Sequence, residues 1–275
     1  MDDSALSFRR RRFQQLHAAG CFVMPNPWDL GSARLLAQMG FPALATTSSG
    51  FAWSRGRPDN GVTLEETLAH LRLISEGVEV PVNADFEGGF AVAPEGVALN
   101  VATATATGIS GISIEDSTGD ASQPLFDFTL AVERVAAARS AIDASRTGVL
   151  LTGRSEGFIV GRPDLGETIR RLKAYADAGA ECLYAPGLRS THDIAAVVQA
   201  VSPKPVNVLV FSDFSTVAEL TQLGVRRISV GGALARTAWS GFLEAAKEIQ
   251  GTGTFTALAR AVSSAYLEDR FRSHL

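Results

Sequence analysis

Two short apolar runs end in acidic side chains whose spacing suits a metal site. Asp85 and Glu87 stand at the end of the run at 80–85, and Glu115 ends the run at 111–115. Side chains alternate along a strand, so the first two carboxylates would share a face if both belonged to the strand. Three converging carboxylates cannot all stay ionised without a compensating cation. Because no His or Cys lies near them, Mg²⁺ or Mn²⁺ is favoured over Zn²⁺; the alternative is a set of hydrogen-bonded acids that cap helices.

A basic residue and a glycine-containing turn add groups that suit an anionic ligand. Arg154 ends the run at 149–154, and a guanidinium can pair with a carboxylate through two hydrogen bonds. Glycine in the turn at 48–51 permits a backbone that aims successive N–H groups at an anion. Together with the acidic residues, these groups predict a site for a chelating 2-oxo carboxylate.

Two other catalytic designs fit the sequence poorly. A Schiff-base enzyme needs a lysine at the site, but Lys173, Lys204 and Lys247 fall on predicted helices or before a strand. The segment 153–157 matches the G-x-S-x-G pattern of a serine-hydrolase elbow, yet the residues after it do not read as the immediate helix that this elbow requires.

The four histidines are predicted to be structural or solvated. His17, His70, His192 and His274 lie on predicted helices, at a helix entry or at the terminus. Their placement removes the usual general base from the site and argues against a Ser-His-Asp triad.

The elements that must position these residues repeat along the chain. A short apolar or β-branched run, a Gly/Pro/Ser/Asp turn and a longer amphipathic stretch recur eight times. The predicted strands are 21–24, 43–46, 80–85, 111–115, 149–154, 182–185, 206–210 and 227–230, and the predicted helices are 30–39, 64–75, 95–106, 128–144, 165–178, 194–201, 216–223 and 233–250.

This alternation predicts a parallel barrel. Strands separated by helices pair in parallel, and eight repeats suit a closed (β/α)8 TIM barrel with its active site at the C-terminal ends of the strands. Several helices end in a glycine that can cap them in the left-handed conformation, at Gly40, Gly108, Gly179 and Gly224. An open doubly wound sheet is the alternative, but no glycine-rich dinucleotide loop follows the first strand.

The length and composition suit one barrel domain. We expect a single domain over 1–275, with the barrel core at about 20–250, a C-terminal helical extension at 251–275 and an extra amphipathic helix at 255–271. The formal net charge of −4 is spread along the chain, so nucleic acid and membrane are not expected partners. We expect the basic run 9–12 to be the solvated face of a first helix.

The cysteine content and the apolar pattern predict a cytoplasmic protein. Cys21 and Cys182 lie in apolar surroundings and suit buried free thiols in a reducing compartment. Neither a leader-like apolar segment nor a run long enough to span a membrane occurs in the sequence.

Several motifs, in order along most of the chain, resemble the isocitrate lyase/phosphoenolpyruvate mutase superfamily. The most specific are Asn83-Ala84-Asp85-Phe86-Glu87-Gly88-Gly89 and Ile114-Glu115-Asp116. The others are Met24-Pro25-Asn26-Pro27-Trp28-Asp29 with Ser32-Ala33-Arg34, Thr47-Ser48-Ser49-Gly50, Asp59 and Gly153-Arg154-Ser155-Glu156.

The resemblance implies a Mg²⁺-dependent barrel enzyme that makes or breaks C–C or P–C bonds beside a carbonyl through enolate-like intermediates. It implies that Asp85 binds the metal directly and that Glu87 and Glu115 hold it through water. The implied catalytic residues are Asp59, Arg154 and Glu115; the implied substrate-binding residues are Trp28, Ser49, Gly50, Phe51, Asp85, Arg154 and Asn207. It also implies a homodimer or homotetramer with its last helices exchanged between subunits.

The loop after the fourth strand departs from the lyase pattern. Lyase members carry Lys-x-Cys-Gly-His there, with cysteine as the catalytic acid or base, whereas this chain reads Ser117-Thr118-Gly119-Asp120-Ala121-Ser122-Gln123-Pro124. True isocitrate or methylisocitrate cleavage is therefore not expected. Asp120, Ser122 and Gln123 belong either to a lid that closes over substrate or to a simple surface loop.

Three functional hypotheses follow. The first is a lyase or decarboxylase that acts on a small 2-oxo or 2-hydroxy dicarboxylic acid, since decarboxylation needs no cysteine acid to form the enolate. The second is phosphonopyruvate or phosphoenolpyruvate chemistry, with Arg154 facing a phosphoryl group. The third is a catalytically silent 2-oxo acid binding protein, because the proton-transfer loop is missing.

Overall fold

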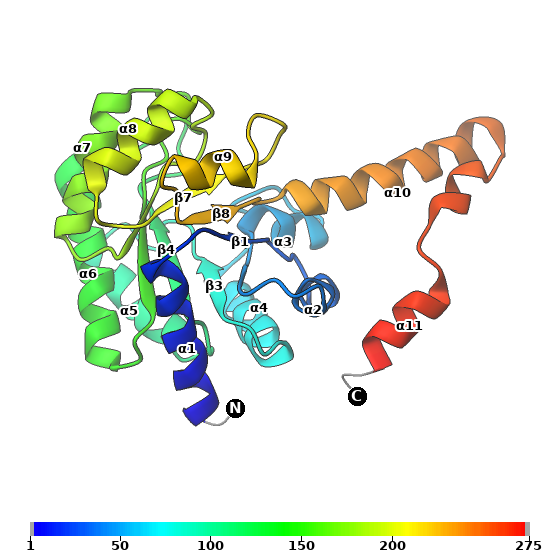
Figure 1. The fold of residues 1–275 in the computed structure, drawn as a ribbon, viewed down its shortest axis with the longest axis horizontal. Helices are drawn as coiled ribbons and strands as arrows, with labels where there is room; N and C mark the ends of the chain where they lie inside the picture. Colours follow the sequence, from blue (N-terminus) through cyan, green and yellow to red (C-terminus); the bar gives the residue numbers. More distant parts are fainter. Residues whose placement is uncertain (1–2, 273–275) are drawn as a thin grey trace.

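The computed structural model describes residues 3–272 and shows eight parallel strands in a nearly closed barrel surrounded by helices (Figure 1). The strands are β1 Phe22–Met24, β2 Leu44–Ala45, β3 Val82–Asp85, β4 Gly111–Glu115, β5 Leu150–Arg154, β6 Cys182–Tyr184, β7 Val206–Leu209 and β8 Arg227–Ser229. Each predicted strand is confirmed, and the hydrogen-bonded order is β1-β8-β7-β6-β5-β4-β3-β2. The predicted (β/α)8 barrel is therefore confirmed.

Helices follow the strands and cover the outside of the barrel. They are α1 Asp3–Ala18, α2 Leu30–Gln38, α3 Ser48–Ser54, α4 Leu64–Gly77, α5 Pro94–Thr105, α6 Phe128–Ser145, α7 Leu165–Asp177, α8 Thr191–Val201, α9 Val217–Gln222, α10 Ala233–Thr252 and α11 Ser264–Arg272, with a 3-10 helix η1 at Thr256–Arg260. The short helix α3 stands where the sequence indicated only a turn.

The predicted glycine caps set the short distance from helix to strand. Gly40, Gly108, Gly179 and Gly224 have φ angles of 87°, 90°, 101° and 85°. A residue with a Cβ is strained in this left-handed region, whereas glycine is not. Each glycine therefore ends its helix and turns the chain back toward the barrel.

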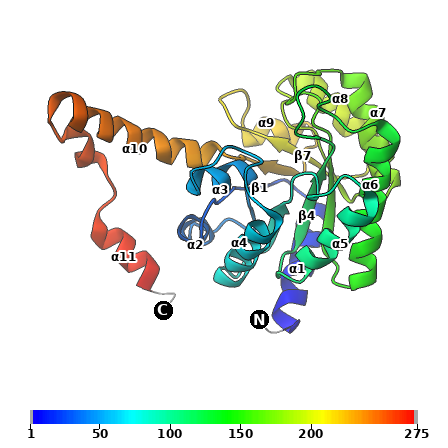
Figure 2. The ribbon, with the colours of Figure 1, turned by 180° about the vertical axis from the view of Figure 1, so that it is seen from behind.

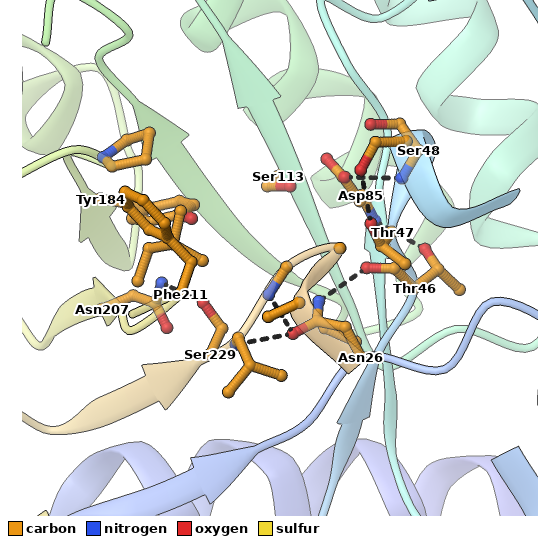
Figure 3. Close-up of a pocket in the computed structure, with 18 of the residues that line it drawn as sticks. Asn26, Thr46, Thr47, Ser48, Asp85, Ser113, Tyr184, Asn207, Phe211 and Ser229 are labelled. Atoms are coloured by element: carbon orange, nitrogen blue, oxygen red, sulfur yellow. Dashed lines mark hydrogen bonds between the residues drawn. The ribbon is translucent and has the colours of Figure 1, made fainter. Parts of the chain in front are cut away.

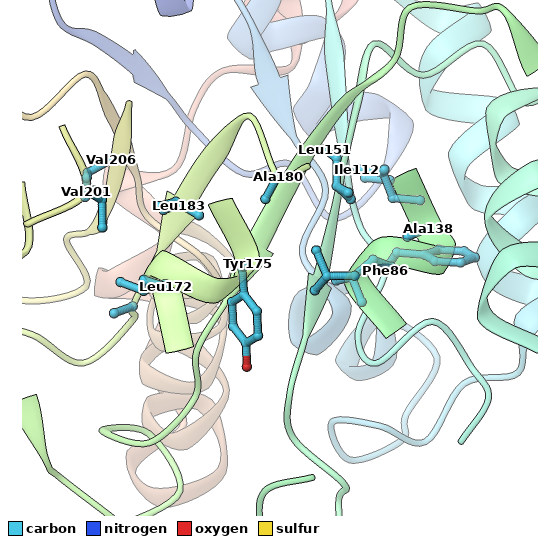
Figure 4. Close-up of a cluster of buried hydrophobic side chains, with 14 of the residues drawn as sticks. Phe86, Ile112, Ala138, Leu151, Leu172, Tyr175, Ala180, Leu183, Val201 and Val206 are labelled. Atoms are coloured by element: carbon cyan, nitrogen blue, oxygen red, sulfur yellow. The ribbon is translucent and has the colours of Figure 1, made fainter. Parts of the chain in front are cut away.

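Alternation along the strands separates an apolar layer from a polar barrel interior. Side chains such as Ile112, Leu151 and Leu183 point outward and pack against the helices in one large buried cluster (Figure 4). Their neighbours Ser113 and Asn207 line the inside of the barrel. Barrel interiors are usually filled by branched apolar residues, so these polar side chains mark an unusual interior.

The seam between β1 and β2 is joined largely through one side chain. Asn26 donates to the carbonyl of Thr46 at 2.9 Å and accepts from the amides of Val230 and Gly231 at 2.9 and 2.8 Å. One backbone bond, from the Ala45 amide to the Pro25 carbonyl at 3.1 Å, also crosses the seam.

Helix α1 closes the N-terminal end of the barrel and corrects one prediction. Arg9 and Arg10 are buried rather than solvated, while Arg11 and Arg12 are exposed. The Arg9 guanidinium donates to the carbonyls of Ser75 and Val78 at 2.8 and 2.7 Å. It thus satisfies carbonyl groups at the C-terminal end of α4, which is why half of the basic run is inside.

The last part of the chain leaves the barrel as an extended arm. Helix α10 runs away from the strands, η1 packs back against its end, and α11 lies farther on, on the side of α2 (Figures 1 and 2). We call residues 233–272 the C-terminal arm. The single helix predicted at 255–271 is wrong, because the chain is extended at Ala261 (φ −66°, ψ 147°) between η1 and α11.

Candidate active site

A cavity of about 280 Å³ opens at the C-terminal ends of the strands. Figure 3 shows Ser48, Thr47 and Asp85 on one side of it and Tyr184, Asn207 and Phe211 on the other. We call it the mouth cavity. Its full wall is formed by Met24, Asn26, Ala45, Thr46, Thr47, Ser48, Ser49, Trp53, Asp59, Asn83, Asp85, Ser113, Arg154, Ile159, Tyr184, Pro186, Asn207, Leu209, Phe211, Arg227, Ser229, Val230, Gly231, Gly232, Ala233 and Arg236.

Arg154 is surrounded by three carboxylates at the edge of this cavity. One nitrogen, Nη1, lies 3.0 Å from Asp85 Oδ1 and 3.0 Å from Glu115 Oε2. The Nε and Nη2 groups donate to Glu156. Although burial alone would lower the pKa of Arg154, Glu115, Glu156 and Asp85 raise it well above its ordinary value, so the guanidinium stays charged. Acidic side chains of the chain itself therefore contact all three nitrogens. The predicted role of Arg154 as a clamp for a substrate carboxylate stays a prediction.

Asp85 is fixed by neighbouring backbone. Its Oδ2 accepts from the Ser48 amide at 2.9 Å, and its own amide donates to Thr46 Oγ1 at 2.9 Å. Because Oδ1 meets Arg154, both oxygens of this carboxylate are held in defined directions. Strand β3 ends here, which places the carboxylate at the mouth as the sequence predicted.

Glu87 and Glu115 face a second cavity beside the mouth. This side cavity lies under the loop at 117–119 and is lined by both residues. The shared face expected for Asp85 and Glu87 does not form, because the strand ends at Asp85 and Glu87 adopts a left-handed φ of 47°.

The two glutamates of the side cavity hold their protons more tightly than exposed glutamates do. Burial, followed by the charges of Asp85 and Asp59, raises the pKa of Glu87 to about 8. Burial also raises the pKa of Glu115 well above its ordinary value. Carboxyl groups whose charged form is this unfavourable would be stabilised by an added cation.

The predicted trio is not gathered into a ready metal centre. Among residues 3–272, no three Asp, Glu, His or Cys side chains come close enough together to hold a metal ion. The physical reason lies in the preceding contacts: Arg154 neutralises Asp85 and Glu115, and the left-handed turn directs Glu87 elsewhere. Binding of a divalent metal at these residues therefore stays a prediction.

The predicted substrate-binding residues separate into two groups. Ser49, Asp85, Arg154 and Asn207 line the mouth cavity, and so does the predicted catalytic residue Asp59. Burial, followed by the charge of Asp85, raises the pKa of Asp59.

The remaining predicted residues lie behind the wall of the mouth cavity. Gly50, Phe51 and Trp28 are not among the side chains that line it. The Gly50 amide donates to Thr47 Oγ1 at 3.3 Å, and the Phe51 amide donates to the Thr47 carbonyl at 3.0 Å. The predicted amide nest is wrong for these two groups, because the first turn of α3 already uses them.

The histidines behave as predicted where they are described. His17 and His70 are buried, and His192 is exposed; His274 lies outside the described residues. The His70 ring stacks on Phe51 with a centroid distance of 3.9 Å, and burial lowers its pKa to about 4.

Sequence reasoning assigned no role to a buried network that supports the acidic edge of the site. Asp116 accepts from the Glu156 amide at 2.7 Å, from Arg171 Nη1 at 3.1 Å and from the Tyr175 hydroxyl at 2.6 Å. Asp116 is 2% exposed, so these contacts satisfy its charge inside the protein. The neighbouring pair Glu115-Asp116 at the end of β4 was the sequence signal for this network. Glu115 faces the site, and Asp116 holds the surrounding residues in place through its hydrogen bonds.

Comparison with known proteins identifies the family. Residues 13–250 match the family model described as phosphoenolpyruvate phosphomutase. The chain belongs to the PEP mutase/isocitrate lyase superfamily. A solved structure from Burkholderia cenocepacia described as a lyase/mutase is 45% identical, with a TM-score of 0.95 and 98% of each chain covered.

Two other relatives have more specific names. An oxaloacetate decarboxylase from Bradyrhizobium diazoefficiens is 29% identical over 71% of this chain and 69% of its own. A solved 2,3-dimethylmalate lyase is 25% identical, with a TM-score of 0.84 and coverage of 97% and 94%. Within residues 3–272, the helices include none with the length and apolar character needed to cross a membrane.

Proposed function

We propose that this protein is a Mg²⁺-dependent lyase or decarboxylase that breaks a C–C bond in a small 2-oxo or 2-hydroxy dicarboxylic acid through an enolate. One observation carries the proposal: Asp85 and Glu115 each place an oxygen 3.0 Å from the same cationic nitrogen at the mouth of the barrel. The oxaloacetate decarboxylase and 2,3-dimethylmalate lyase relatives support C–C cleavage of small acids.

The donor set fits a hard divalent cation. Asp85 and Glu115 offer carboxylate oxygens that meet at one positive centre, and Glu87 carries a buried oxygen, Oε1, that has no protein partner. We propose Asp85 as a direct ligand and the two glutamates as residues that hold the ion through water, with Mg²⁺ favoured and Mn²⁺ a substitute. The ion would supply positive charge for the oxygen on which the enolate charge develops.

The residues around this centre have distinct proposed roles. Arg154 binds the acid group of the substrate when it gives up its contacts with Asp85 and Glu115. Asp59 moves a proton at the cavity wall, because burial and the charge of Asp85 raise its pKa. Ser49 and Asn207 donate hydrogen bonds to the bound acid.

The loop at 117–124 favours decarboxylation over isocitrate-type cleavage. It holds no cysteine, and Asp120 accepts hydrogen bonds from Ser122 within the loop itself. Loss of carbon dioxide from a carboxyl group β to the 2-oxo carbonyl leaves its electron pair as an enolate directly, so an acid from this loop is not needed to form it. An oxaloacetate-like substrate is therefore preferred.

The C-terminal arm supports an oligomeric enzyme. Phe242, Phe255 and Val262 on the arm are 59%, 62% and 61% exposed. Apolar side chains exposed together in this way mark surfaces that contact another chain. We propose a homodimer or homotetramer in which these residues are covered by a second copy.

Calorimetric titration of metal-stripped protein tests the proposed site. Oxalate and 2-oxoglutarate are expected to bind with Mg²⁺ and at least about 100-fold more weakly without it, a size typical of lost metal coordination. Asp85→Ala should abolish the Mg²⁺-dependent binding, whereas Asp177→Asn, at the end of α7, should preserve it. Failure of both acids to bind under any metal condition would overturn the proposal.

The matched family model keeps one second candidate open. Its description as phosphoenolpyruvate phosphomutase favours P–C chemistry, with Arg154 facing a phosphoryl group. Turnover of phosphonopyruvate but not of oxaloacetate by the Mg²⁺-loaded enzyme would select this candidate.

A further inference from the structure

Arg227 places a guanidinium inside the barrel below the mouth cavity. It is the first residue of β8 and is 1% exposed. Its Nε donates to Asn207 Oδ1 at 2.9 Å and its Nη2 to Thr152 Oγ1 at 3.1 Å, while Nη1 lies 3.2 Å from His17 Nε2. The side chain is therefore held in place by three neighbours from β7, β5 and α1.

All three neighbours are neutral. Asn207 and Thr152 carry no charge, and burial together with the charge of Arg227 lowers the pKa of His17 to about 3. His17 Nδ1 lies 2.8 Å from the Phe13 carbonyl, so the neutral ring donates its Nδ1–H to that carbonyl and Nε2 is left to accept from Arg227. The ion pairs formed within residues 3–272 do not include Arg227, in contrast to Arg154 and its three carboxylates.

A buried charge without a counter-charge is costly, and a guanidinium cannot relieve the cost by losing its proton. Arg227 lines the mouth cavity, and its partner Asn207 lies on the side opposite Asp85 (Figure 3). A cleft with low-dielectric walls focuses the electric field of such a charge into the space that the cleft encloses. The deep side of the cavity is therefore positive, whereas on the other side Asp85 is paired with Arg154.

We propose that Arg227 makes the deep side of the mouth cavity a subsite for the second acid group of the substrate. The inference rests on the proposed function and extends it by assigning a residue that selects diacids over monoacids. In this arrangement the reacting 2-oxo acid end lies toward Asp85, and the distal carboxylate lies toward Asn207 and Arg227. Asn207 is then a positioning residue as well as a wall residue, because Arg227 fixes its amide.

The test compares two ligands of equal chain length that differ in the distal carboxylate. Binding of 2-oxoglutarate and 2-oxovalerate to the Mg²⁺-loaded enzyme is measured by calorimetry. The wild type is expected to prefer the diacid by at least about tenfold, the size of one moderate charge interaction. Asn207→Asp puts a carboxylate at the atom that now lies 2.9 Å from Nε, so it should reduce the preference for the diacid over the monoacid to about one.

Two variants of Arg227 separate charge from shape. Arg227→Gln should lose the diacid preference, and Arg227→Lys should retain most of it. Thermal unfolding provides an independent readout, since Asn207→Asp should raise the melting temperature by giving the buried cation a partner.

A third cation supplies the matched control. Arg236, on the first turn of α10, lines the same cavity from its exposed rim. Arg236→Gln should keep the diacid preference. Loss of the preference in Arg236→Gln alone, or its survival in folded Asn207→Asp and Arg227→Gln, would overturn the inference while leaving the proposed function intact; a wild type that binds neither acid would overturn both.

Discussion

The barrel buries its apolar side chains, whereas the C-terminal arm exposes many of its own. Along the strands, apolar side chains such as Ile112 and Leu151 point outward and pack with the helices in a common buried core. Within α10, Ala235 is the buried residue, while Trp239, Phe242 and Leu243 are 39%, 59% and 48% exposed. The barrel is stabilised by its own packing, whereas the arm exposes apolar surface that gives it no stability by itself.

The arm is nevertheless ordered by local polar contacts. Glu248 accepts from the amides of Thr256 and Ala257, both at 2.7 Å. Side-chain hydrogen bonds from Thr254 and Thr256, followed by these amide bonds, lower its pKa to about 2. At its far end, the Gln38 side chain of α2 donates to the Arg270 carbonyl at 2.7 Å. An arm held in shape by hydrogen bonds but left with apolar faces is suited to contact another molecule.

The largest expected effect is on assembly. Phe242→Ser combined with Phe255→Ser should reduce the molar mass in solution to that of one chain, because the exposed rings would supply the contact between copies. Sedimentation equilibrium measures the mass. Leu73→Ser, which changes a half-exposed side chain on α4 of the barrel, is the matched control and should keep the wild-type mass. An unchanged mass in the double variant would mean that the exposed rings of the arm do not hold the copies together.

The next largest expected effect is on the pH dependence of stability, and it comes from the N-terminal end of the barrel that α1 closes, here called the barrel floor. Burial, followed by the charge of Arg227, lowers the pKa of His17 from 6.5 to about 3. Between these two pH values His17 is therefore protonated in the unfolded chain and neutral in the folded chain. Its contribution is complete above pH 6.5 and is lost as the pH falls toward 3, by about 1.4 kcal/mol for each pH unit. Chemical unfolding at pH 7 and about pH 5 should show a smaller loss of stability in His17→Gln than in the wild type.

The matched variant for this measurement is His192→Gln. Its side chain is 87% exposed, so it should lose stability with falling pH as the wild type does. Equal losses in all three proteins would show that His17 is protonated in the folded barrel.

The smallest effect separates two arginines of α1. Arg9→Met should lower the free energy of unfolding by about 1–3 kcal/mol, because it leaves two buried carbonyls without their donor. Arg11→Met should change it by no more than about 0.5 kcal/mol, as expected for an exposed side chain. Urea unfolding of both variants measures the difference, and equal values would mean that the two bonds of Arg9 do not stabilise the barrel floor.

The fold was predictable because its signals are local and repeated. Strand alternation, amphipathic helices and glycine caps each depend on residues close together in the chain, and all eight strands follow them. The break at Ala261 was missed because residues 255–271 keep a helical apolar pattern through it. Helix α3 was missed because Ser48, Ser49 and Gly50 are common turn residues and the helix is only one or two turns long.

The site was predictable in its residues but not in their pairing. The polar ends of the strands placed Asp85 and Arg154 at one cavity, and the family resemblance added Asp59, which lines the same cavity. Which acid meets which base depends on contacts across the barrel, such as Arg154 with Asp85, 69 positions apart. Arg227 was missed for a related reason: periodicity says that it faces the barrel interior, but nothing local shows that its neighbours there are neutral.

The seam between β1 and β2, which Asn26 joins, affects where the barrel opens locally. Elsewhere neighbouring strands are joined by ladders, whereas β1 and β2 meet through one amide side chain and one backbone bond. Local opening should therefore start at this seam, and the amide proton of Ala45 should exchange with solvent faster than that of Ile112 or Leu151 in the middle of the sheet. Because Thr46 and Thr47 follow this seam and line the mouth cavity, opening of the seam would also loosen that wall of the cavity.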